Sequence, residues 1–246
     1  MKFIFLIIFW LSNFIAQGQL VDSLNTALKC SYMKPEEIEM IYEINRLRSD
    51  PKSYLIYIEP MLVQAKNILK TFGKGNKNYS VTYSTIIRND KEIKKTDTVW
   101  HYTNEEEVSA LTGLVNDLKR SKKLSVLKPD AGIYKAASYF AADEDAHQWN
   151  LVHVGSDGSM PWDRITKFSP SMAFGNENLA GKYPEPTARD IVILLLIDSG
   201  IPGYGHRYNL LNPQWTHVAC VSGGLKEGMY HWIQNFGRAK QSSSLQ

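Results

Sequence analysis

Three residues in the C-terminal half of this 246-residue chain could bind a metal ion or transfer a proton. They are His153, Glu177 and His206, in the segments LVHVGSDGSMPWDRI, GNENLA and GYGHRYNLLNPQW. Each lies beside glycine or other turn residues, which can direct a side chain into a cleft instead of a core. Two neutral imidazoles fill half of a zinc shell, at Zn–N distances of about 2.0–2.1 Å, and leave positions for water and a carboxylate. A lone histidine is more often structural, so this chemistry requires that the three residues share one cleft.

The elements predicted around these residues would hold them at turns. Apolar periodicity predicts a helix over 132–149, and His153 follows it just before the turn Gly155-Ser156-Asp157-Gly158. The amides of Asn176 and Asn178 flank Glu177 and could hold its carboxylate in place. Glycines and Pro202 bring the chain round to His206 at the start of a short helix, where the helix dipole favours a neutral, metal-competent imidazole.

Two further features of this half are ambiguous when taken alone. The acidic run Asp143-Glu144-Asp145 is interpreted as a solvated face, because three consecutive residues cannot share one helix face. The apolar run 191–197 fits a helix or a buried strand, but the capping-box pattern that begins at Thr187 favours the helix. His217 and His231 lie in predicted late strands and are expected to be packed or hydrogen-bonded.

The N-terminal half is predicted to be mainly helical with one hairpin. A helix begins at Pro35, a second covers 52–69, and glycines end it near residue 73. The segment 79–102 is rich in threonine, tyrosine, valine and isoleucine around the turn RNDKE, which indicates a hairpin. Helical pattern returns at Asn104, expected to cap the helix together with Glu107. Its predicted buried stripe is Ala110, Leu111, Leu114, Val115 and Leu118.

The order of four motifs resembles one known family. H-x-G-S-D-G-S-x-P-W-D-R-I, N-E-N-L-A, G-H-R-x-N-L-L-N-P-x-W-T and Y-x-W-I-Q-x-F-G occur in this order, as they do in the CAP superfamily of cysteine-rich secretory, antigen 5 and pathogenesis-related proteins, also called SCP domains. The resemblance is best to the bacterial branch and covers about 127–238, with 43–55 similar to the family's first helix. The region 73–102 has no counterpart and is interpreted as an insertion.

This resemblance implies an α+β fold, a three-layer α-β-α sandwich on a small central antiparallel sheet. It also implies a cleft with two histidines and two acids, in which the histidines of many members bind a divalent metal. Carried over by motif, the metal ligands are His153 and His206, the first acid is Glu177, and Zn2+ or another divalent cation is the expected metal. The second acid normally lies on the helix before the second histidine, where this chain offers Asp198 in LLIDSG and a leucine replaces the usual tryptophan. No organic cofactor is expected.

The N-terminal residues indicate the cellular location of the protein. Residues 1–18 have a lysine, a short apolar stretch and the exit Ala16-Gln17-Gly18, which is typical of a signal peptide. A retained anchor is the alternative, although the stretch is shorter than the roughly 18 apolar residues of a spanning helix. We therefore expect a secreted or periplasmic protein that does not span the membrane after signal cleavage. An N-terminal segment over 19–33, one domain over 34–240 and a disordered tail over 241–246 complete the expected organisation.

Charge and cysteine content limit the other functions. The formal net charge is +3, with 28 basic and 25 acidic residues, which is too balanced to indicate nucleic-acid binding. Cys30 and Cys220 are the only cysteines. In an oxidising compartment they could form a disulfide, and two free thiols are the equal alternative.

Three functional hypotheses follow from the sequence. The first is a secreted binding module with a metal at His153 and His206 and a small apolar or glycan ligand. The second is a metal-dependent hydrolase of peptide or ester bonds, with Glu177 as base and Asp198 as the second catalytic acid. The third is an envelope or surface interaction protein with a vestigial cleft and a contact made by the 73–102 hairpin. The first is favoured over an enzyme because the sequence has no nucleophile-elbow pattern and no evident third metal ligand.

Overall fold

The computed structural model describes residues 23–88, 91–147, 151–182, 186–226 and 229–241, with the backbone alone for 76–101. The chain divides into two compact units. The first comprises Met1–Pro51, Lys122–Leu195 and His206–Gln246, and the second comprises Lys52–Ser121 and Leu196–Gly205. The predicted domain over 34–240 therefore covers both units, whereas the predicted signal peptide and all but one residue of the predicted tail lie outside the described residues.

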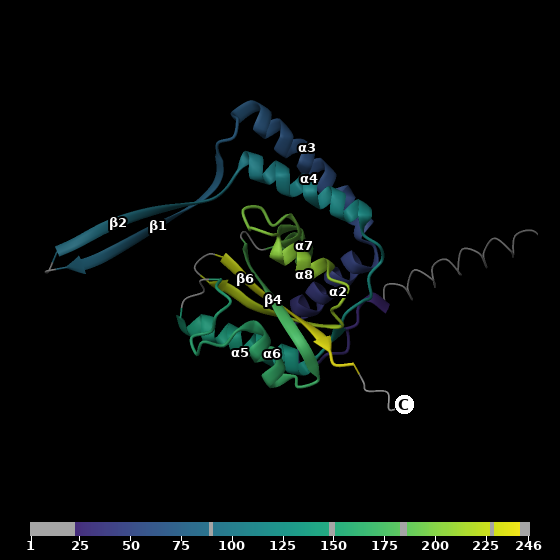
Figure 1. Cartoon of the computed structure of the whole chain (residues 1–246). Coiled ribbons are helices and arrows are strands. Elements are labelled where there is room, and N and C mark those ends of the chain that lie inside the picture. The colour runs from purple at the N-terminus through teal and green to yellow at the C-terminus, as the bar shows by residue number, and fades with distance from the viewer. Residues whose placement is uncertain (1–22, 89–90, 148–150, 183–185, 227–228, 242–246) are drawn as a thin grey trace, which may run out of the picture. The chain divides into compact units, whose positions relative to one another are not determined.

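A four-stranded sheet forms the centre of the first unit (Figure 1). Its strand order is β3 (Lys128–Pro129), β5 (His217–Lys226), β6 (Met229–Ala239) and β4 (Met172–Lys182). The β5–β6 and β6–β4 pairs are antiparallel, and the two-residue β3 adds a short parallel pair to β5. β4 is an edge strand, and side chains from both layers of the unit can therefore reach it.

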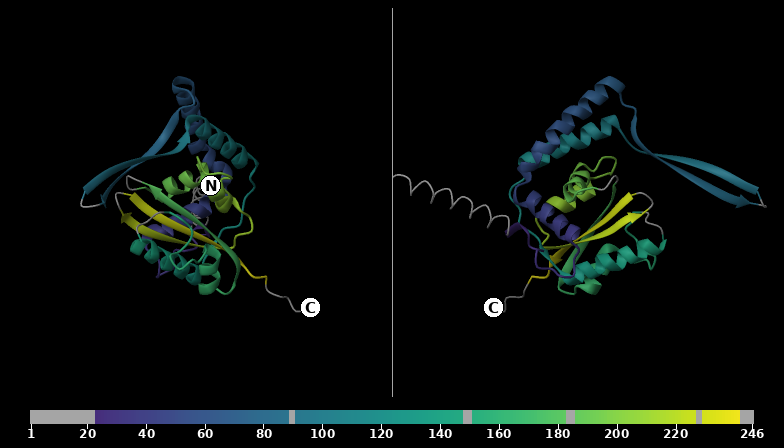
Figure 2. Two further views of the ribbon diagram at one scale, coloured as in Figure 1. Left: turned by 60° about the vertical axis from the view of Figure 1, so that its left-hand side comes forward. Right: turned by 180° about the vertical axis from the view of Figure 1, so that it is seen from behind.

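Helices cover both faces of this sheet, as Figure 2 shows. One layer holds α5 (Ala131–His147) and α6 (Pro161–Phe168), and the other holds α2 (Pro35–Ser49), α8 (Gly205–Leu211) and α7 (Ala188–Ile197), which belongs to this unit as far as Leu195. Strand side chains alternate between the layers. Leu179, Val221 and Ile233 pack against α5, whereas Gln234 contacts Met40 of α2. The unit is the α+β, α-β-α sandwich that the sequence predicted.

The second unit contains two long helices joined by a hairpin. α3 (Leu55–Phe72) follows the short 3-10 helix η1 (Pro51–Tyr54), and β1 (Asn76–Arg88) and β2 (Lys91–Thr103) lead into α4 (Asn104–Arg120). β1 and β2 pair antiparallel over their lengths, which confirms the predicted hairpin. All five residues of the predicted apolar stripe of α4 are buried.

The cap of α4 differs from the prediction. Thr103, not Asn104, is the N-cap: its hydroxyl accepts from the Glu106 N–H, and the Glu106 carboxylate accepts from the Thr103 N–H. The Asn104 side chain instead donates to the carbonyl of Gly73 at 2.8 Å, at the end of α3. The sequence contains two possible capping boxes one residue apart, Thr103 with Glu106 and Asn104 with Glu107. The structure uses the first, with Thr103 as the last residue of β2.

In the first unit, one expectation is wrong and one open alternative is decided. The acidic run on α5 is not a uniformly solvated face, because Glu144 is buried and accepts the Leu151 N–H at 3.3 Å. Cys30 and Cys220 are free thiols and not a disulfide. Burial raises the pKa of the Cys220 thiol well above its usual value, so this side chain behaves as a small apolar core residue.

Candidate functional site

Glu177 and His153 form the centre of the site. Glu177 lies on β4 and its side chain is fully buried, whereas the His153 ring, in the loop after α5, is 41% exposed. The His153 Nδ1 lies 3.1 Å from Glu177 Oε1. An ionised carboxylate only accepts hydrogen bonds, so Nδ1 carries the proton and the Nε2 lone pair of a neutral His153 is left for a ligand.

Arg164 holds Glu177 and was not identified from the sequence. Its Nη2 lies 3.1 Å from both Glu177 carboxylate oxygens, and the side chains of both residues are buried. The same Nη2 donates to the His153 carbonyl at 3.1 Å, and the guanidinium stacks on the ring of Phe140 at 3.9 Å. One arginine thereby orients both the carboxylate and the histidine. The signal was present in the P-W-D-R-I motif, whose only arginine lies in the first turns of the helix that follows the loop.

Hydrogen bonds to two aspartates, Asp143 and Asp157, hold the loop that contains His153. Asp143 on α5 accepts from the hydroxyl of Ser156 and from its N–H, the latter at 2.8 Å, and the bond from the hydroxyl, followed by that from the N–H, lowers the pKa of Asp143. Asp157 accepts from Ser159 N–H and from the Tyr139 hydroxyl, both at 2.9 Å. The bonds from Ser159, followed by that from Tyr139, lower the pKa of Asp157 to about 2. Asp143 and Asp157 therefore stabilise the conformation of this loop.

His206 comes from the opposite layer, at the start of α8. The Asn178 amide donates to the His206 carbonyl at 3.3 Å, and Asn209 one turn along α8 donates to Asn178 Oδ1 at 2.8 Å. At the other end of α8, buried Arg48 donates to the carbonyls of Leu210 and Asn212 at 3.0 and 2.9 Å. Burial lowers the pKa of Arg48 to about 10, and the guanidinium remains charged at neutral pH. Both ends of this short helix are therefore fixed.

The two histidine rings approach each other across the edge strand β4. Their centroids are 6.5 Å apart and their planes are inclined by 45°. With Zn–N bonds of about 2.0–2.1 Å, two histidine ligands at a tetrahedral angle would have their ring centroids about 5 Å apart, so the two rings would have to approach by about 1 Å to share one ion. A divalent ion held by His153 and His206 stays a prediction. Within the described residues, no group of three or more His, Cys, Asp or Glu side chains is arranged to hold a metal.

The asparagines beside Glu177 do not act as predicted. Asn176 accepts from the Glu177 backbone N–H at 2.9 Å and donates to Asn209 at 3.1 Å, while Asn178 bonds His206 and Gln234. Neither amide bonds the Glu177 carboxylate, because alternate strand residues point to opposite faces of the sheet. Glu177 faces α6, and the two asparagines face α8.

Asp198 is the predicted second acid of the cleft, and it lies outside the group of contacts described above. It follows α7 in the segment Leu196–Gly205, which groups with the second unit, and its side chain is buried. Its φ of 55° ends the helix in the left-handed region, which aspartate tolerates better than most residues. Its participation in the site stays a prediction.

The sequence relationship agrees with this fold and site. The profile of the Cysteine-rich secretory protein family, CAP, matches residues 112–236, just over half of the chain. The chain belongs to the CAP family. The match includes His153, Glu177 and His206 and ends in β6.

Two solved structures are similar to this CAP protein. An outer surface protein from Borrelia burgdorferi has 20% sequence identity and a TM-score of 0.41, and the match covers 55% of this chain and 95% of that one. An extracellular protein containing a SCP domain from Bacillus anthracis str. Ames has 16% identity and a TM-score of 0.36, with 71% of each chain covered. No significant match was found among curated proteins.

Proposed function

We propose that this CAP protein is a secreted binding protein whose cleft holds a divalent metal, with zinc as the expected ion, between His153 and His206. One observation carries the proposal: the Glu177 carboxylate bonds Nδ1 of His153 and leaves Nε2 as the nitrogen that can bind a metal, while the ring centroid of His206 lies 6.5 Å from that of His153. A carboxylate behind a ligating histidine is the usual support of a zinc ligand.

Two protein ligands would leave the metal open to an outside molecule. A bound zinc ion would supply a Lewis acid and free coordination positions. A small apolar or glycan ligand with an oxygen donor is the expected occupant. The role of Glu177 and Arg164 is to fix the tautomer and direction of His153.

Zinc titration by calorimetry tests this proposal. Wild type is expected to bind one zinc ion, and His153→Ala and His206→Ala are each expected to abolish that binding. His147→Ala is the matched control, because His147 is an exposed histidine on α5 that bonds Asp143. Unchanged zinc binding in both cleft variants would rule the site out.

A secreted or periplasmic location accompanies this function. Membership of a secretory-protein family and the signal-like segment at residues 1–18 support it. Among the described residues, no helix is both long enough and apolar enough to cross a bilayer. Mass spectrometry of the exported chain is expected to place its first residue near Gln19, and an intact Met1 would contradict cleavage.

The contacts of Glu177 favour the binding role over the metal-dependent hydrolase. A general base must reach the proton that it abstracts, directly or through one water. The Glu177 side chain is fully buried, and its oxygens accept bonds from Arg164 and His153. Ester or peptide hydrolysis that is lost with a chelator and with Glu177→Gln would restore the enzymatic hypothesis.

The hairpin supports a third role, that of a surface contact. β1 and β2 form a two-stranded sheet of their own, so their outer edges have no strand partner within the described residues. Such edges can pair with another chain. Replacing 76–103 by a short Gly-Ser loop is expected to leave zinc binding intact. If partner capture also survives the replacement, the hairpin is not the contact.

A further inference from the structure

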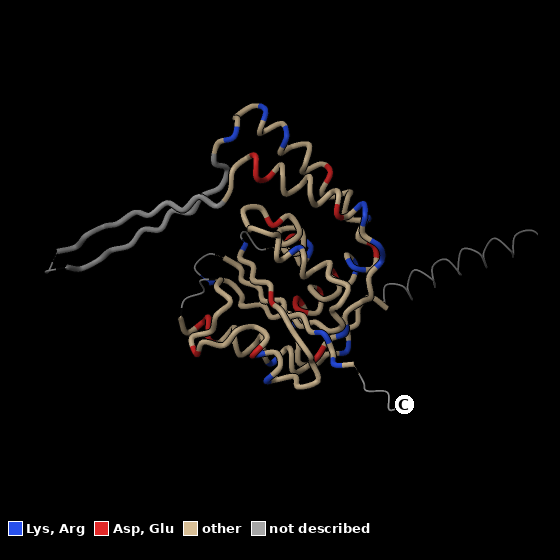
Figure 3. Tube along the Cα trace, viewed as in Figure 1, with Lys and Arg blue, Asp and Glu red and all other residues tan. Residues whose placement is uncertain are grey.

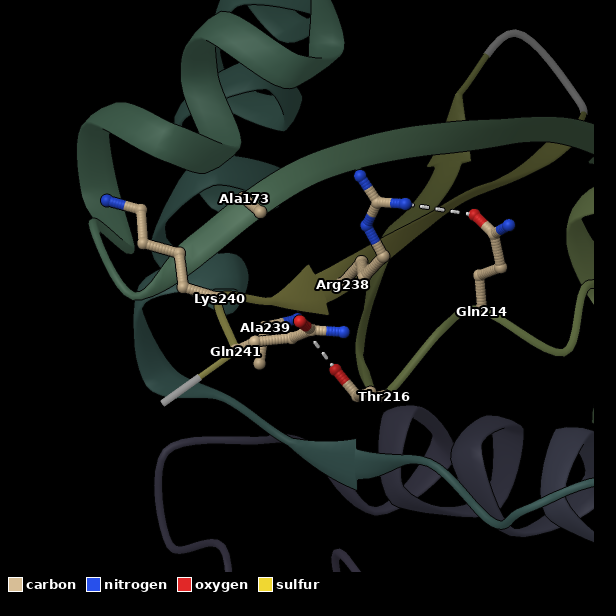
Figure 4. A pocket seen from close by; sticks show the side chains of 7 residues that line it. All are labelled: Ala173, Gln214, Thr216, Arg238, Ala239, Lys240 and Gln241. Atoms are coloured by element: carbon tan, nitrogen blue, oxygen red, sulfur yellow. Dashed lines mark hydrogen bonds between the residues drawn. The ribbon is translucent and has the colours of Figure 1, made fainter. Parts of the chain in front are cut away.

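Some polar side chains of the first unit reach solvent and others do not. Figure 4 shows exposed ones in a pocket at the end of β6, where the guanidinium of Arg238 donates to Gln214 Oε1 at 3.1 Å. Solvent can satisfy the remaining polar atoms there. A buried polar atom is out of reach of bulk solvent, and burying it without a hydrogen bond is costly. Buried atoms of this kind therefore point to a missing partner.

Asn235 on β6 has such a buried amide. The residue is fully buried, and neither Oδ1 nor Nδ2 has a hydrogen-bond partner within the described residues. Its direct cross-strand neighbours are Glu177 on β4 and Ala219 on β5, and such neighbours have Cβ atoms about 4.5–5.5 Å apart on one face of the sheet. The methyl group of Ala219 offers no hydrogen bond. Of these two neighbours, only Glu177 can share a polar partner with the amide.

Arg164 contributes a third unsatisfied atom beside the same carboxylate. Its Nη2 lies 3.1 Å from both Glu177 oxygens and its Nη1 donates to the Ser159 carbonyl at 2.7 Å, but its buried Nε has no partner within the described residues. Because the guanidinium is small and planar, Nε lies close to the carboxylate as well. Glu177 Oε1 accepts from His153 and Arg164, whereas Oε2 accepts from Arg164 and can accept a second bond.

These atoms together suit a small neutral molecule. Asn235 Nδ2 and Arg164 Nε are donors, and Asn235 Oδ1 and Glu177 Oε2 are acceptors. The charge of Arg164 disfavours a cation at this place, and the charge of Glu177 disfavours an anion. Water both donates and accepts, and a buried water typically makes about three hydrogen bonds, with a range of 2–4, to buried polar groups that lack other partners.

We propose that one buried water molecule joins Asn235 to Glu177 and Arg164, and that Asn235 is thereby a positioning residue for His153. The water accepts from Asn235 Nδ2 and Arg164 Nε and donates to Glu177 Oε2 and Asn235 Oδ1. It holds the second carboxylate oxygen of Glu177, while the first bonds His153 Nδ1. The carboxylate is then fixed at both oxygens, and with it the tautomer of His153.

NMR of the zinc-free protein tests the water. Rotating-frame Overhauser spectra are expected to show contacts between a long-lived water and the side-chain N–H protons of Asn235 and Arg164. Asn235→Leu, which has a similar size and no polar atom, is expected to abolish the contact of the Arg164 Nε–H. Ile233→Val, a change on the same face of β6, is the matched control and is expected to retain it. Wild-type spectra without a water contact to either side chain would overturn the proposal.

The tautomer of His153 tests the positioning role, also without metal. The nitrogen chemical shifts of the ring are expected to place the proton on Nδ1 in wild type and to show a mixture of tautomers in Asn235→Leu. Asn235→Ser retains a hydroxyl that can donate and accept, and it is expected to restore the wild-type tautomer. A wild-type tautomer in Asn235→Leu would show that Asn235 does not position His153.

The consequence for metal binding rests on the proposed function. Asn235→Leu is expected to weaken zinc binding about threefold, less than the loss of the carboxylate itself, because the water supports Glu177 and not the ligand directly. Calorimetry that gives equal zinc affinities for wild type and Asn235→Leu would contradict the positioning role. If wild type binds no zinc, the metal site fails, and the water contacts and the His153 tautomer still decide the role of Asn235.

Discussion

At the scale of single residues, the buried pair of Arg164 and Glu177 decides how the CAP site is built. A buried ion pair has a large desolvation cost and adds little net stability against an apolar pair of the same shape. Its value here is geometric, because the guanidinium joins both carboxylate oxygens to the backbone carbonyl of His153. The pair sets the direction in which His153 presents Nε2.

Removing one member of the pair is expected to be costly. Arg164→Met would leave the Glu177 carboxylate buried without its cation and should lower the free energy of unfolding by about 3–5 kcal/mol. Adding Glu177→Gln should recover part of this loss, because the uncompensated charge is removed. Denaturant unfolding of the two single variants and the double variant measures the coupling. Additive effects would contradict a direct pair.

Glu177 also has a predicted effect on the metal. Glu177→Gln is expected to weaken zinc binding by about 10–100-fold, the usual cost of losing a carboxylate behind a ligating histidine. Asn176→Asp changes a neighbouring side chain that makes no bond to the carboxylate and serves as the comparison. Calorimetric affinities that are equal for wild type and Glu177→Gln would show that Glu177 does not orient His153.

The lowered pKa of Asp157 predicts how the stability of the folded state changes with pH. Its folded-state pKa of about 2 lies below the unfolded value of about 3.9, so the ionised side chain stabilises the folded state above about pH 4. The contribution is lost as the pH falls towards 2. The stability difference between wild type and Asp157→Asn should therefore be largest above pH 4, fall between pH 4 and 2 and vanish below about pH 2, as measured by denaturant unfolding.

A titration of the Asp157 carboxyl carbon by NMR provides the direct check. Tyr139→Phe removes one hydrogen-bond donor and should raise the pKa of Asp157. Tyr134→Phe, which removes a hydroxyl bonded to Glu37, should not change it. An Asp157 midpoint near 3.9 in wild type would contradict the loop network.

At the scale of elements, the site depends on the edge position of β4. The loop after α5 supplies His153 from one layer, α8 supplies His206 from the other, and the strand between them carries Glu177. A central strand would be flanked on both sides and would separate the two rings. Because β4 has a free edge, imidazoles from opposite faces can meet there.

The start of α4 gives a prediction at this scale. Thr103→Ala removes the acceptor for the Glu106 N–H and is expected to lower the free energy of unfolding by about 1 kcal/mol. Thr103→Ser retains a hydroxyl and should cost much less. Thermal unfolding of both variants distinguishes this cap from the one first expected at Asn104. A cost that is the same for alanine and serine would contradict the Thr103 cap.

At the scale of the whole molecule, the chain combines a first unit that contains most of the CAP match with a second unit of two helices and a hairpin. The first unit contains the four-stranded sheet and the proposed metal site. Figure 3 shows basic and acidic residues interspersed along the described trace. The nearly balanced charge gives no reason to expect nucleic-acid binding.

The state of the two cysteines is a prediction for the molecule as a whole. Alkylation in denaturant without reductant is expected to add two groups to the chain, because both thiols are free. In the native protein Cys30 should react first, because Cys220 is buried and its raised pKa keeps it protonated. Mass spectrometry distinguishes the sites. Alkylation that requires prior reduction would instead indicate a disulfide.

The sequence by itself determined the family, the layered fold, the hairpin and the three central residues of the site. These follow from local patterns: helical periodicity, turn residues, and motifs whose order is independent of distance. Only the tertiary structure decided the role of Arg164, the cap at Thr103, the burial of Glu144 and the true partners of Asn176 and Asn178. Each of these depends on which side chain of a distant element lies within about 3 Å of a donor or an acceptor, the reach of a hydrogen bond. Spacing along the chain contains no such information.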